Sequence, residues 1–308
     1  MIDLSEWPAL VLSAGLATRL RPVSDVRAKA AMPVAGTPII GRILSWLREA
    51  GVRRVVLNLH HRPETITRIV GDGAEWDLQV RYSWERDILG SAGGPRRALP
   101  LLEADRFLIV NGDTLTDCDL RAVAARHLET GARVTMAVVP GDVARYGGVL
   151  IRPDGCVQGF GKPTPDTRAL HFIGVQAVEA EVFREVPDDV ASETVRTLYP
   201  QLLAARATAI GVFESTAEFL DVGTAADYLS TVATVAARER RPIDIGVDCD
   251  VAPDAVLKNT VLWDCVTVGA GAELINCVVT DNVEVPAGAR FAGSALVATP
   301  DGMTARPF

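Results

Sequence analysis

A short loop near the N-terminus combines small residues with two arginines. A strand-like run, Leu10–Ser13, leads into the loop of residues 13–18, and Arg19 and Arg21 follow at once. Backbone N–H groups converge in a glycine-containing loop after a strand and can bind phosphate oxygens. A guanidinium can add two parallel hydrogen bonds, and Lys29 supplies a further positive charge. These residues suggest a cradle for a polyphosphate, and the alternative is a surface turn with solvated arginines.

The composition narrows the classes of function. The chain has 308 residues, nearly half of them apolar, and a formal net charge of −8. That charge argues against a general nucleic-acid binder but not against a small anionic substrate. Its five cysteines form no C-x-x-C pair, which excludes the common zinc-knuckle and redox motifs. The apolar run near the N-terminus is too short to span a bilayer. We therefore expect a soluble, cytoplasmic protein with no membrane or nucleic-acid partner.

The first half of the chain alternates strand-like and helix-like stretches. The strand-like stretches are Leu10–Ser13, 52–59, 78–84 and 106–113, and the helix-like stretches are Ile39–Ala50 and Glu64–Val70. This alternation predicts α/β layers around a mainly parallel sheet. Three more strand-like stretches, at 133–140, 147–155 and 171–178, include a Pro-Asp-Gly turn, so part of the sheet is predicted to be antiparallel. Asp227–Arg240 is predicted to be an amphipathic helix that stops at Pro242.

Beyond Pro242 the pattern repeats every seventeen residues. The repeating positions are Val251, Val268 and Val285; Leu257, Leu274 and Phe291; and Leu262, Val279 and Leu296. Such spacing predicts a left-handed β-helix of three coils with aliphatic residues inside, and the alternative is a small β-rich tail. A stack this short leaves an open end, which we expect to need a cap or a partner chain. The tail cysteines, Cys249, Cys265 and Cys277, are predicted to pack in the coils.

The N-terminal loop resembles a known signature. In the sugar-1-phosphate nucleotidyltransferases the loop usually reads L-A-A-G-x-G-T-R-L-R-P, followed by P-K-x-L-x-P-V. The residues kept here are Gly15, Thr18, Arg19, Arg21, Pro22, Lys29 and Pro33. Ala17 replaces a glycine and Ala28 a proline. If position 17 needs a positive φ, alanine adds strain there.

Further landmarks follow in the order of that family. Residues 85–94 resemble the segment that closes over the base, in its guanylyltransferase form, and residues 110–115 resemble the strand end that binds magnesium. Residues 145–151 and 160–163 resemble segments that meet the sugar phosphate, although Gly161 replaces a glutamate. Residues 172–183, 192–203 and 219–229 resemble the sugar-side strand, the glutamate helix and the second magnesium motif. The resemblance implies a Rossmann-like, GT-A-like mixed-sheet nucleotidyltransferase domain in residues 1–241 and a short left-handed parallel β-helix in residues 242–308.

The resemblance also implies the site residues. As catalytic residues it implies Arg19, Lys29 and Lys162. As nucleotide-binding residues it implies Leu12, Ala14, Gly15, Leu16, Ala17, Thr18, Glu85, Gly90, Ser91, Ala92, Gly93, Asn111 and Gly112. As sugar-phosphate-binding residues it implies Tyr146, Gly147, Lys162, Gly174 and Glu193, and as ligands of Mg²⁺ it implies Asp113 and Asp221.

These residue types suit nucleotidyl transfer to a sugar 1-phosphate with release of pyrophosphate. A phosphate monoester has a second pKa near ~6, so the attacking oxygen needs no base at neutral pH. Two anions must approach each other, so arginine, lysine and magnesium have to neutralise charge.

The identity of the substrates stays open at this point. The leading pair is GTP with mannose 1-phosphate or a related heptose 1-phosphate, and the nearest competitor is a uridylyltransferase, for example of the N-acetylmuramate type. Two further hypotheses are a non-catalytic nucleotide-sugar-binding regulatory homologue and a glycosyltransferase. The D-x-D triplet that a glycosyltransferase would need, Asp117-Cys118-Asp119, is interpreted as helix capping. The expected assembly is a homo-oligomer, with a dimer favoured.

Overall fold

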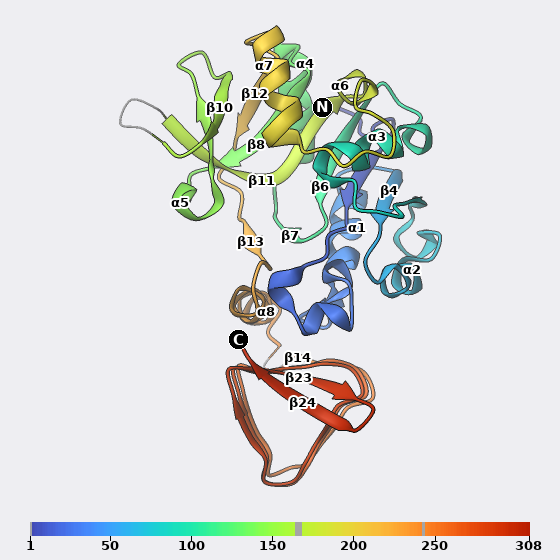
Figure 1. The fold of residues 1–308 in the computed structure, drawn as a ribbon, viewed down its shortest axis with the longest axis vertical. Coiled ribbons are helices and arrows are strands. Elements are labelled where there is room, and N and C mark those ends of the chain that lie inside the picture. Colours follow the sequence, from blue (N-terminus) through green and yellow to red (C-terminus); the bar gives the residue numbers. More distant parts are fainter. Residues whose placement is uncertain (1, 164–167, 242–243) are drawn as a thin grey trace. The chain divides into compact units, whose positions relative to one another are not determined.

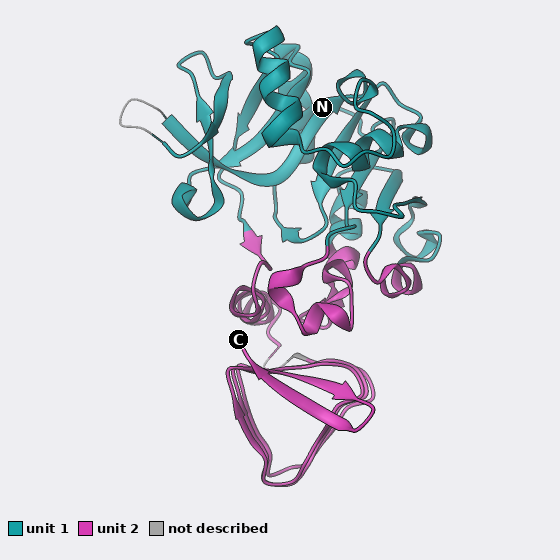
Figure 2. Cartoon of the chain, in the orientation of Figure 1, with its two compact units in different colours: residues 1–15, 43–60, 70–219 teal, residues 16–42, 61–69, 220–308 magenta. Residues whose placement is uncertain are grey.

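The computed structural model describes residues 2–163, 168–241 and 244–308. The described chain divides into two compact units, coloured separately in Figure 2. The first unit comprises residues 1–15, 43–60 and 70–219, and the second comprises residues 16–42, 61–69 and 220–308. The expected domain boundary at Pro242 and the expected helix stop there lie outside the described residues.

A run of parallel strands forms part of the sheet in the first unit (Figure 1). The strands β1 (Ala9–Leu12), β4 (Arg54–Leu59), β5 (Gln79–Trp84) and β6 (Arg106–Asn111) lie in the order β6-β1-β4-β5. Every pair in this run is parallel. Buried aliphatic residues fill β1, β4 and β6, which is typical of strands covered on both faces.

The other strands make the sheet mixed, as the sequence predicts. The long strand β11 (Arg168–Glu179) is antiparallel to β6, to β8 (Val134–Val139) and to β9 (Gly148–Ile151). The strand β10 (Val157–Gly161) forms a hairpin with β9 across the predicted Pro-Asp-Gly turn. The strand β12 (Ile210–Glu214) runs parallel to β8.

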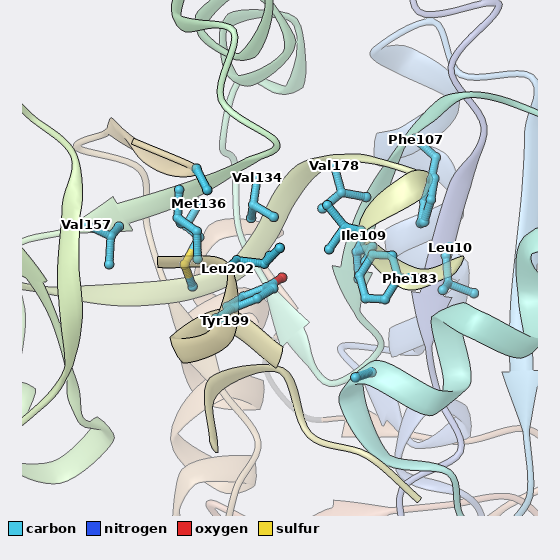
Figure 3. Close-up of a cluster of buried hydrophobic side chains, with 14 of the residues drawn as sticks. Leu10, Phe107, Ile109, Val134, Met136, Val157, Val178, Phe183, Tyr199 and Leu202 are labelled. Atoms are coloured by element: carbon cyan, nitrogen blue, oxygen red, sulfur yellow. The ribbon is translucent and has the colours of Figure 1, made fainter. Parts of the chain in front are cut away.

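One face of this sheet is covered by three helices, α3 (Gly90–Leu102), α6 (Glu181–Arg184) and α7 (Tyr199–Ala205). Figure 3 shows their side chains packed on those of the strands, including Phe183 and Tyr199 beside Ile109 and Met136. The helix α4 (Leu120–Thr130) packs on β8, β11 and β12. Asp119 caps α4 by accepting the N–H groups of residues 121 and 122, which confirms its capping role.

Four more α-helices and four two-residue strands precede the tail among the described residues. The helices are α1 (Ile39–Glu49), α2 (Pro63–Val70), α5 (Val143–Tyr146) and α8 (Ala225–Arg238), and the strands are β2 (Pro33–Val34), β3 (Thr37–Pro38), β7 (Thr114–Leu115) and β13 (Leu220–Asp221). No helix among the described residues is long and apolar enough to cross a membrane.

The C-terminal tail is a stack of short parallel strands that outlines a triangle in Figure 1. The first side consists of β14 (Asp244–Ile245), β17 (Val261–Leu262), β20 (Val278–Val279) and β23 (Ser294–Thr299). The second side consists of β15 (Asp250–Val251), β18 (Thr267–Val268) and β21 (Glu284–Val285). The third side is β16 (Val256–Lys258), β19 (Glu273–Ile275) and β22 (Arg290–Ala292). Each residue pairs with the residue seventeen positions on, which confirms the predicted repeat.

The chain itself supplies a cap for the last coil. The strand β24 (Gly302–Pro307) returns antiparallel to β23, and its Met303 and Ala305 pack on the aliphatic core of the stack. Of the tail cysteines, Cys277 is buried and Cys249 half-buried, but Cys265 is exposed, so its predicted packing role is wrong. Cys265 lies at a corner of the coil, where its φ is positive, and corner residues of the stack face solvent instead of the aliphatic core.

Candidate active site

The ends of β1, β4 and β6 place polar groups at one edge of the parallel strands. Leu12 pairs with Asn58 on one side and with Asn111 on the other. The N–H of Gly112 donates to the carbonyl oxygen of Leu12 at 2.8 Å, and a Cβ atom at position 112 would lie 2.7 Å from that oxygen. Glycine is therefore required for this close approach. Carboxyl ends of parallel strands are where open α/β sheets bind their ligands.

A buried hydrogen-bond network supports this edge. The N–H of Ser13 donates to Asn58 Oδ1 at 2.6 Å, and Asn58 Nδ2 donates to Glu85 Oε1 at 2.7 Å. Glu85 Oε2 accepts the N–H of Leu89 at 2.9 Å. Both oxygens of this predicted nucleotide ligand are thus bound by the protein. The geometry indicates that Glu85 shapes the segment before α3.

The N-terminus of α3 packs on the segment that follows residue 190. Ser192 O accepts the N–H groups of Ala92 and Gly93, at 2.9 and 3.3 Å. Ser91 Oγ donates to Glu193 Oε2 at 2.8 Å. Gly90 has φ +74°, and a Cβ atom there would lie 2.7 Å from Ser192 O. The structure therefore brings Gly90, Ser91, Ala92 and Gly93 together with Glu193, and two of their amides are already bound.

From Leu16 onward the N-terminal loop belongs to the second unit, and Ala17 in it has a strained backbone conformation. Ala17 adopts φ 49° and ψ 43°, the left-handed conformation that glycine tolerates best. The carbonyl oxygen of Ala17 accepts Ser24 Oγ and the N–H of Leu20, both at 2.9 Å. Leu20 is buried whereas Arg19 is exposed. The loop is thus held by its buried residue and directs Arg19 outward, while Gly15, Leu16 and Thr18 are also exposed.

Asp221 lies close to Arg19 within the same unit. A Cβ atom at Gly223 would lie 2.7 Å from Asp221 Oδ2 and 3.3 Å from Arg19 Nη2. The missing side chain at Gly223 therefore leaves room for both groups. The other predicted metal ligand, Asp113, belongs to the first unit, directly after Gly112 and half-buried.

Lys29 begins a short 3₁₀ helix, Lys29–Ala31, in the second unit. Its side chain is half-buried, and Ala30 and Ala31 beside it are buried. The preceding N–H, that of Ala28, donates to Thr65 Oγ1 at 3.1 Å. The backbone that carries Lys29 is therefore anchored to α2.

An aromatic cluster lies on the predicted sugar side of the first unit. The ring centroids of Tyr146 and His171 are 4.6 Å apart, and those of His171 and Phe219 are 4.4 Å apart. Neither ring nitrogen of the buried His171 has a hydrogen-bond partner among the described residues. Burial lowers the pKa of His171, and the carboxylate of Asp142 opposes this effect only in part. The imidazole is therefore neutral at pH 7.

The other predicted sugar-side residues lie in β11, directly after α5 and directly after β10. Gly174 has φ +78°, and a Cβ atom there would lie within 2.9 Å of the Asn111 side chain. The absence of a side chain at Gly174 therefore leaves room for the Asn111 side chain at the end of β6. Gly147 also has a positive φ, directly after α5. Lys162 is exposed directly beyond β10.

Comparison with known proteins decides the family. A model of the nucleotidyl transferase family matches residues 8–238. The chain belongs to the nucleotidyl transferase family. Mannose-1-phosphate guanylyltransferase of Mycobacterium tuberculosis is 30% identical over 292 residues, which cover 91% of this chain and 81% of that protein. N-acetylmuramate alpha-1-phosphate uridylyltransferase of Neisseria meningitidis is 32% identical over 227 residues, covering 70% and 93%.

A solved structure shows the same fold. The structure of HddC from Yersinia pseudotuberculosis aligns with a TM-score of 0.65 at 23% identity, covering 74% of this nucleotidyltransferase and 99% of that chain. At this identity the likeness concerns the fold alone. The chain is thus an enzyme of the nucleotidyltransferase class with the mixed α/β sheet of its relatives.

Two residues of this nucleotidyltransferase site escaped the sequence analysis. Asn58 links the first loop to Glu85, and the available signal was an asparagine inside the apolar run of residues 52–59. Ser192 closes the N-terminus of α3 through its carbonyl oxygen. No side-chain pattern could have revealed that contact, because backbone carbonyls are common to all residues.

Proposed function

We propose that this nucleotidyltransferase transfers a guanylyl group from GTP to mannose 1-phosphate or a related heptose 1-phosphate and releases pyrophosphate. One observation carries the proposal: the family model matches residues 8–238, a span that contains the charged residues to which we assign roles in the reaction. The Mycobacterium tuberculosis relative, named as a mannose-1-phosphate guanylyltransferase, supports the choice of base and sugar.

The proposed mechanism relies on charge neutralisation and positioning. The sugar phosphate is largely dianionic at neutral pH, since its second pKa is near ~6, and attacks the α-phosphorus as pyrophosphate leaves. Arg19 would hold the triphosphate, Lys29 the oxygens of the α-phosphate, and Lys162 the sugar phosphate. The exposure of Arg19 and Lys162 supports these roles, because both side chains can reach a ligand. Cations placed in advance stabilise the negative charge of the transition state.

The proposed nucleotide site comprises the first loop, the β6 end and the α3 start. Leu12, Ala14, Gly15, Leu16, Ala17 and Thr18 would surround the phosphates with backbone groups. Asn111 and Gly112, together with Glu85 and residues 90–93, would form the base and ribose side. Tyr146, Gly147, Gly174 and Glu193 would face the sugar phosphate.

Asp113 and Asp221 are proposed as ligands of Mg²⁺. Members of the family generally depend on a metal. The donor set fits magnesium, which binds through one or two carboxylates and keeps several waters and substrate phosphates. Among the described residues, no group of three or more His, Cys, Asp or Glu side chains forms a fuller cage. When bound, the ion would neutralise phosphate charge.

We further propose that residues 1–241 contain the catalytic functions and that residues 242–308 form a separate β-helix domain. The proposed assembly is a homodimer in the cytoplasm. Light scattering of the purified protein tests the assembly, and a monomer at micromolar concentration would contradict it.

A pyrophosphate-release screen tests the proposed reaction. Purified protein with Mg²⁺ is given each common NTP with each of a panel of sugar 1-phosphates. We expect the fastest release with GTP and a manno-configured sugar phosphate. Fastest release with UTP would favour a uridylyltransferase, which the Neisseria meningitidis relative supports. Binding of nucleotide without release for any pair would favour a regulatory homologue.

A further inference from the structure

Arg27 is held by two aspartates of the β-helix. Its Nη2 lies 2.5 Å from Asp264 Oδ2 and 2.6 Å from Asp281 Oδ1, and its Nε donates to Asp281 Oδ2 at 2.8 Å. The side chain is only 15% exposed, and its guanidinium carbon lies 5.1 Å from the centroid of the Trp263 ring. The two carboxylates bind the N–H groups of the guanidinium, and the indole ring of Trp263 packs against its plane. The guanidinium is therefore not available to bind a substrate phosphate.

The two aspartates are themselves fixed by the repeat. Asp264 and Asp281 occupy equivalent positions in successive coils, seventeen residues apart. The N–H of Asp264 donates to Asp281 Oδ1 at 3.1 Å, and Asp264 Oδ1 accepts the N–H of Val247 at 2.9 Å. The carboxylates are thus oriented by β-helix backbone, which gives Arg27 a preformed binding site.

A second connection starts one residue away on the same coil. Trp263 Nε1 donates to the hydroxyl of Tyr228 at 3.1 Å, and that hydroxyl donates to the carbonyl oxygen of Pro33 at 2.5 Å. Trp263 and Tyr228 are fully buried. The coil at residues 263 and 264 is therefore connected to the chain at Arg27 directly and at Pro33 through Tyr228.

Lys29 lies between these two anchored points. The segment of residues 27–33, here named the Lys29 segment, is held at Arg27, at Ala28 through Thr65, and at Pro33. We propose that Arg27 is a positioning residue through which the β-helix fixes the backbone of Lys29 for nucleotidyl transfer. This inference rests on the proposed role of Lys29 and assigns the β-helix a part in catalysis without a catalytic residue. A displacement of about 1 Å in a positioned group can slow a reaction by roughly a hundredfold.

Steady-state kinetics with the best substrate pair tests the proposal. We expect Arg27→Ala to lower kcat by about tenfold to a hundredfold, with Arg27→Lys recovering part of the loss, because a lysine keeps the charge but loses the paired contacts. Arg290→Ala is the matched control, since Arg290 forms an exposed 3.6 Å pair with Glu273 in the same stack. The control should retain wild-type kcat. A kcat for Arg27→Ala within about twofold of wild type, where circular dichroism shows a folded protein, would overturn the proposal.

A double-mutant cycle separates positioning from a general structural effect. If Arg27 acts through Lys29, Arg27→Ala should cost less than about threefold when Lys29 is already alanine. If Arg27→Ala lowered kcat in the Lys29→Ala variant as much as it does in wild type, Arg27 would act independently of Lys29, which would overturn the proposal. If Arg27→Ala does not fold, Asp281→Asn replaces it in the same cycle, since it keeps the shape but removes the charge that Arg27 binds.

Amide hydrogen exchange tests the inference without substrate. We expect the amides of the Lys29 segment to exchange at least about tenfold faster in Arg27→Ala than in wild type or Arg290→Ala. Equal protection would overturn the inference. If none of the tested substrate pairs gives pyrophosphate release by the wild-type protein, the proposed function fails. The exchange result then still decides whether Arg27 holds the Lys29 segment.

Discussion

At the scale of single residues, Arg19 and Arg27 show how surroundings decide the role of one side-chain type. Both belong to the stretch between β1 and Lys29. Arg27 is surrounded by two carboxylates and an indole ring, so its charge is already balanced. Arg19 is exposed beside Gly223. A guanidinium must be accessible to bind phosphate, which favours Arg19 as the ligand of the triphosphate.

Arg19 and Lys162, which are both exposed, should affect the binding of different substrates. Arg19→Ala is expected to weaken NTP binding and slow the reaction, whereas Lys162→Ala should mainly raise the KM for the sugar phosphate. A lost contact of this kind is worth roughly 1.5–3 kcal/mol, or about tenfold to a hundredfold. Initial rates measured while each substrate is varied in turn would test this. A Lys162→Ala variant with only its NTP KM altered would contradict our placement of the two substrates.

Asp113 and Asp221, the proposed magnesium ligands, should be needed for turnover and not for folding. We expect Asp113→Asn and Asp221→Asn each to lower kcat by about a hundredfold or more, because a neutral amide is a poor ligand for a hard cation. Magnesium titration of kcat, with circular dichroism as the control for folding, is the measurement. Near-normal turnover of either variant at saturating magnesium would exclude that residue as an essential ligand.

At the scale of elements, the β-helix corners show a regular use of the left-handed conformation. Asn259, Asn276 and Gly293 occupy one corner with φ values of 46°, 53° and 55°. Asparagine and glycine are the residues that tolerate this conformation best. The equivalent residues at another corner are Asp248, Cys265 and Asn282, with φ values of 55°, 58° and 59°. Cys265 is the one residue of these six without a chemical reason to be there.

We therefore expect Cys265→Asn to stabilise the protein by about 0.5–1 kcal/mol, because asparagine adopts a positive φ at lower cost. Cys277→Asn is the matched control, since the same change at a buried position places an amide in the aliphatic core and should destabilise by about 1–3 kcal/mol. Thermal unfolding of both variants under reducing conditions is the measurement. A lower melting temperature for Cys265→Asn would refute this explanation of the corner.

These elements also show what the sequence can predict. The parallel strands and the seventeen-residue repeat were predictable because periodic burial and turn chemistry are local properties of the chain. A positive φ at Ala17 could be expected only because the resembling family has glycine at this position, and the structure shows a φ of 49° there. The contacts of Arg27 with Asp264 and Asp281 were not predictable, because they join residues more than two hundred positions apart. The contact of Ala92 with Ser192 was not predictable either, because it joins residues one hundred positions apart.

At the scale of the whole molecule, two buried histidines link folding to pH. Burial lowers the pKa of His127, and the nearby carboxylate of Glu179 opposes this only in part. Burial also lowers the pKa of His171, with Asp142 opposing it. The unfolded chain therefore binds protons at a higher pH than the folded chain does. As the pH falls below the ordinary histidine pKa of about 6.5, protons stabilise the unfolded state and the free energy of unfolding decreases.

The carboxylates affect stability in a separate pH range. Hydrogen bonds from Arg152 and from the backbone N–H of Cys156 lower the pKa of Asp154 to about 2. A carboxylate whose pKa is lowered in the folded state contributes stability above its unfolded pKa, near ~4, and loses it as the pH falls further. The decrease in stability between about pH 6.5 and pH 5 should therefore come mainly from the histidines.

Replacing His171 isolates its share of that decrease. His171→Phe places an apolar ring between Tyr146 and Phe219 and removes two buried nitrogens that have no partner among the described residues. Below pH 6.5 each neutral buried histidine should contribute a slope of up to about 1.4 kcal/mol per pH unit. Urea denaturation at pH 7.5, 6.5 and 5.5 should thus show a smaller loss of stability in the variant, with similar values at pH 7.5. Parallel curves for variant and wild type across this range would show that His171 does not lose its proton on folding.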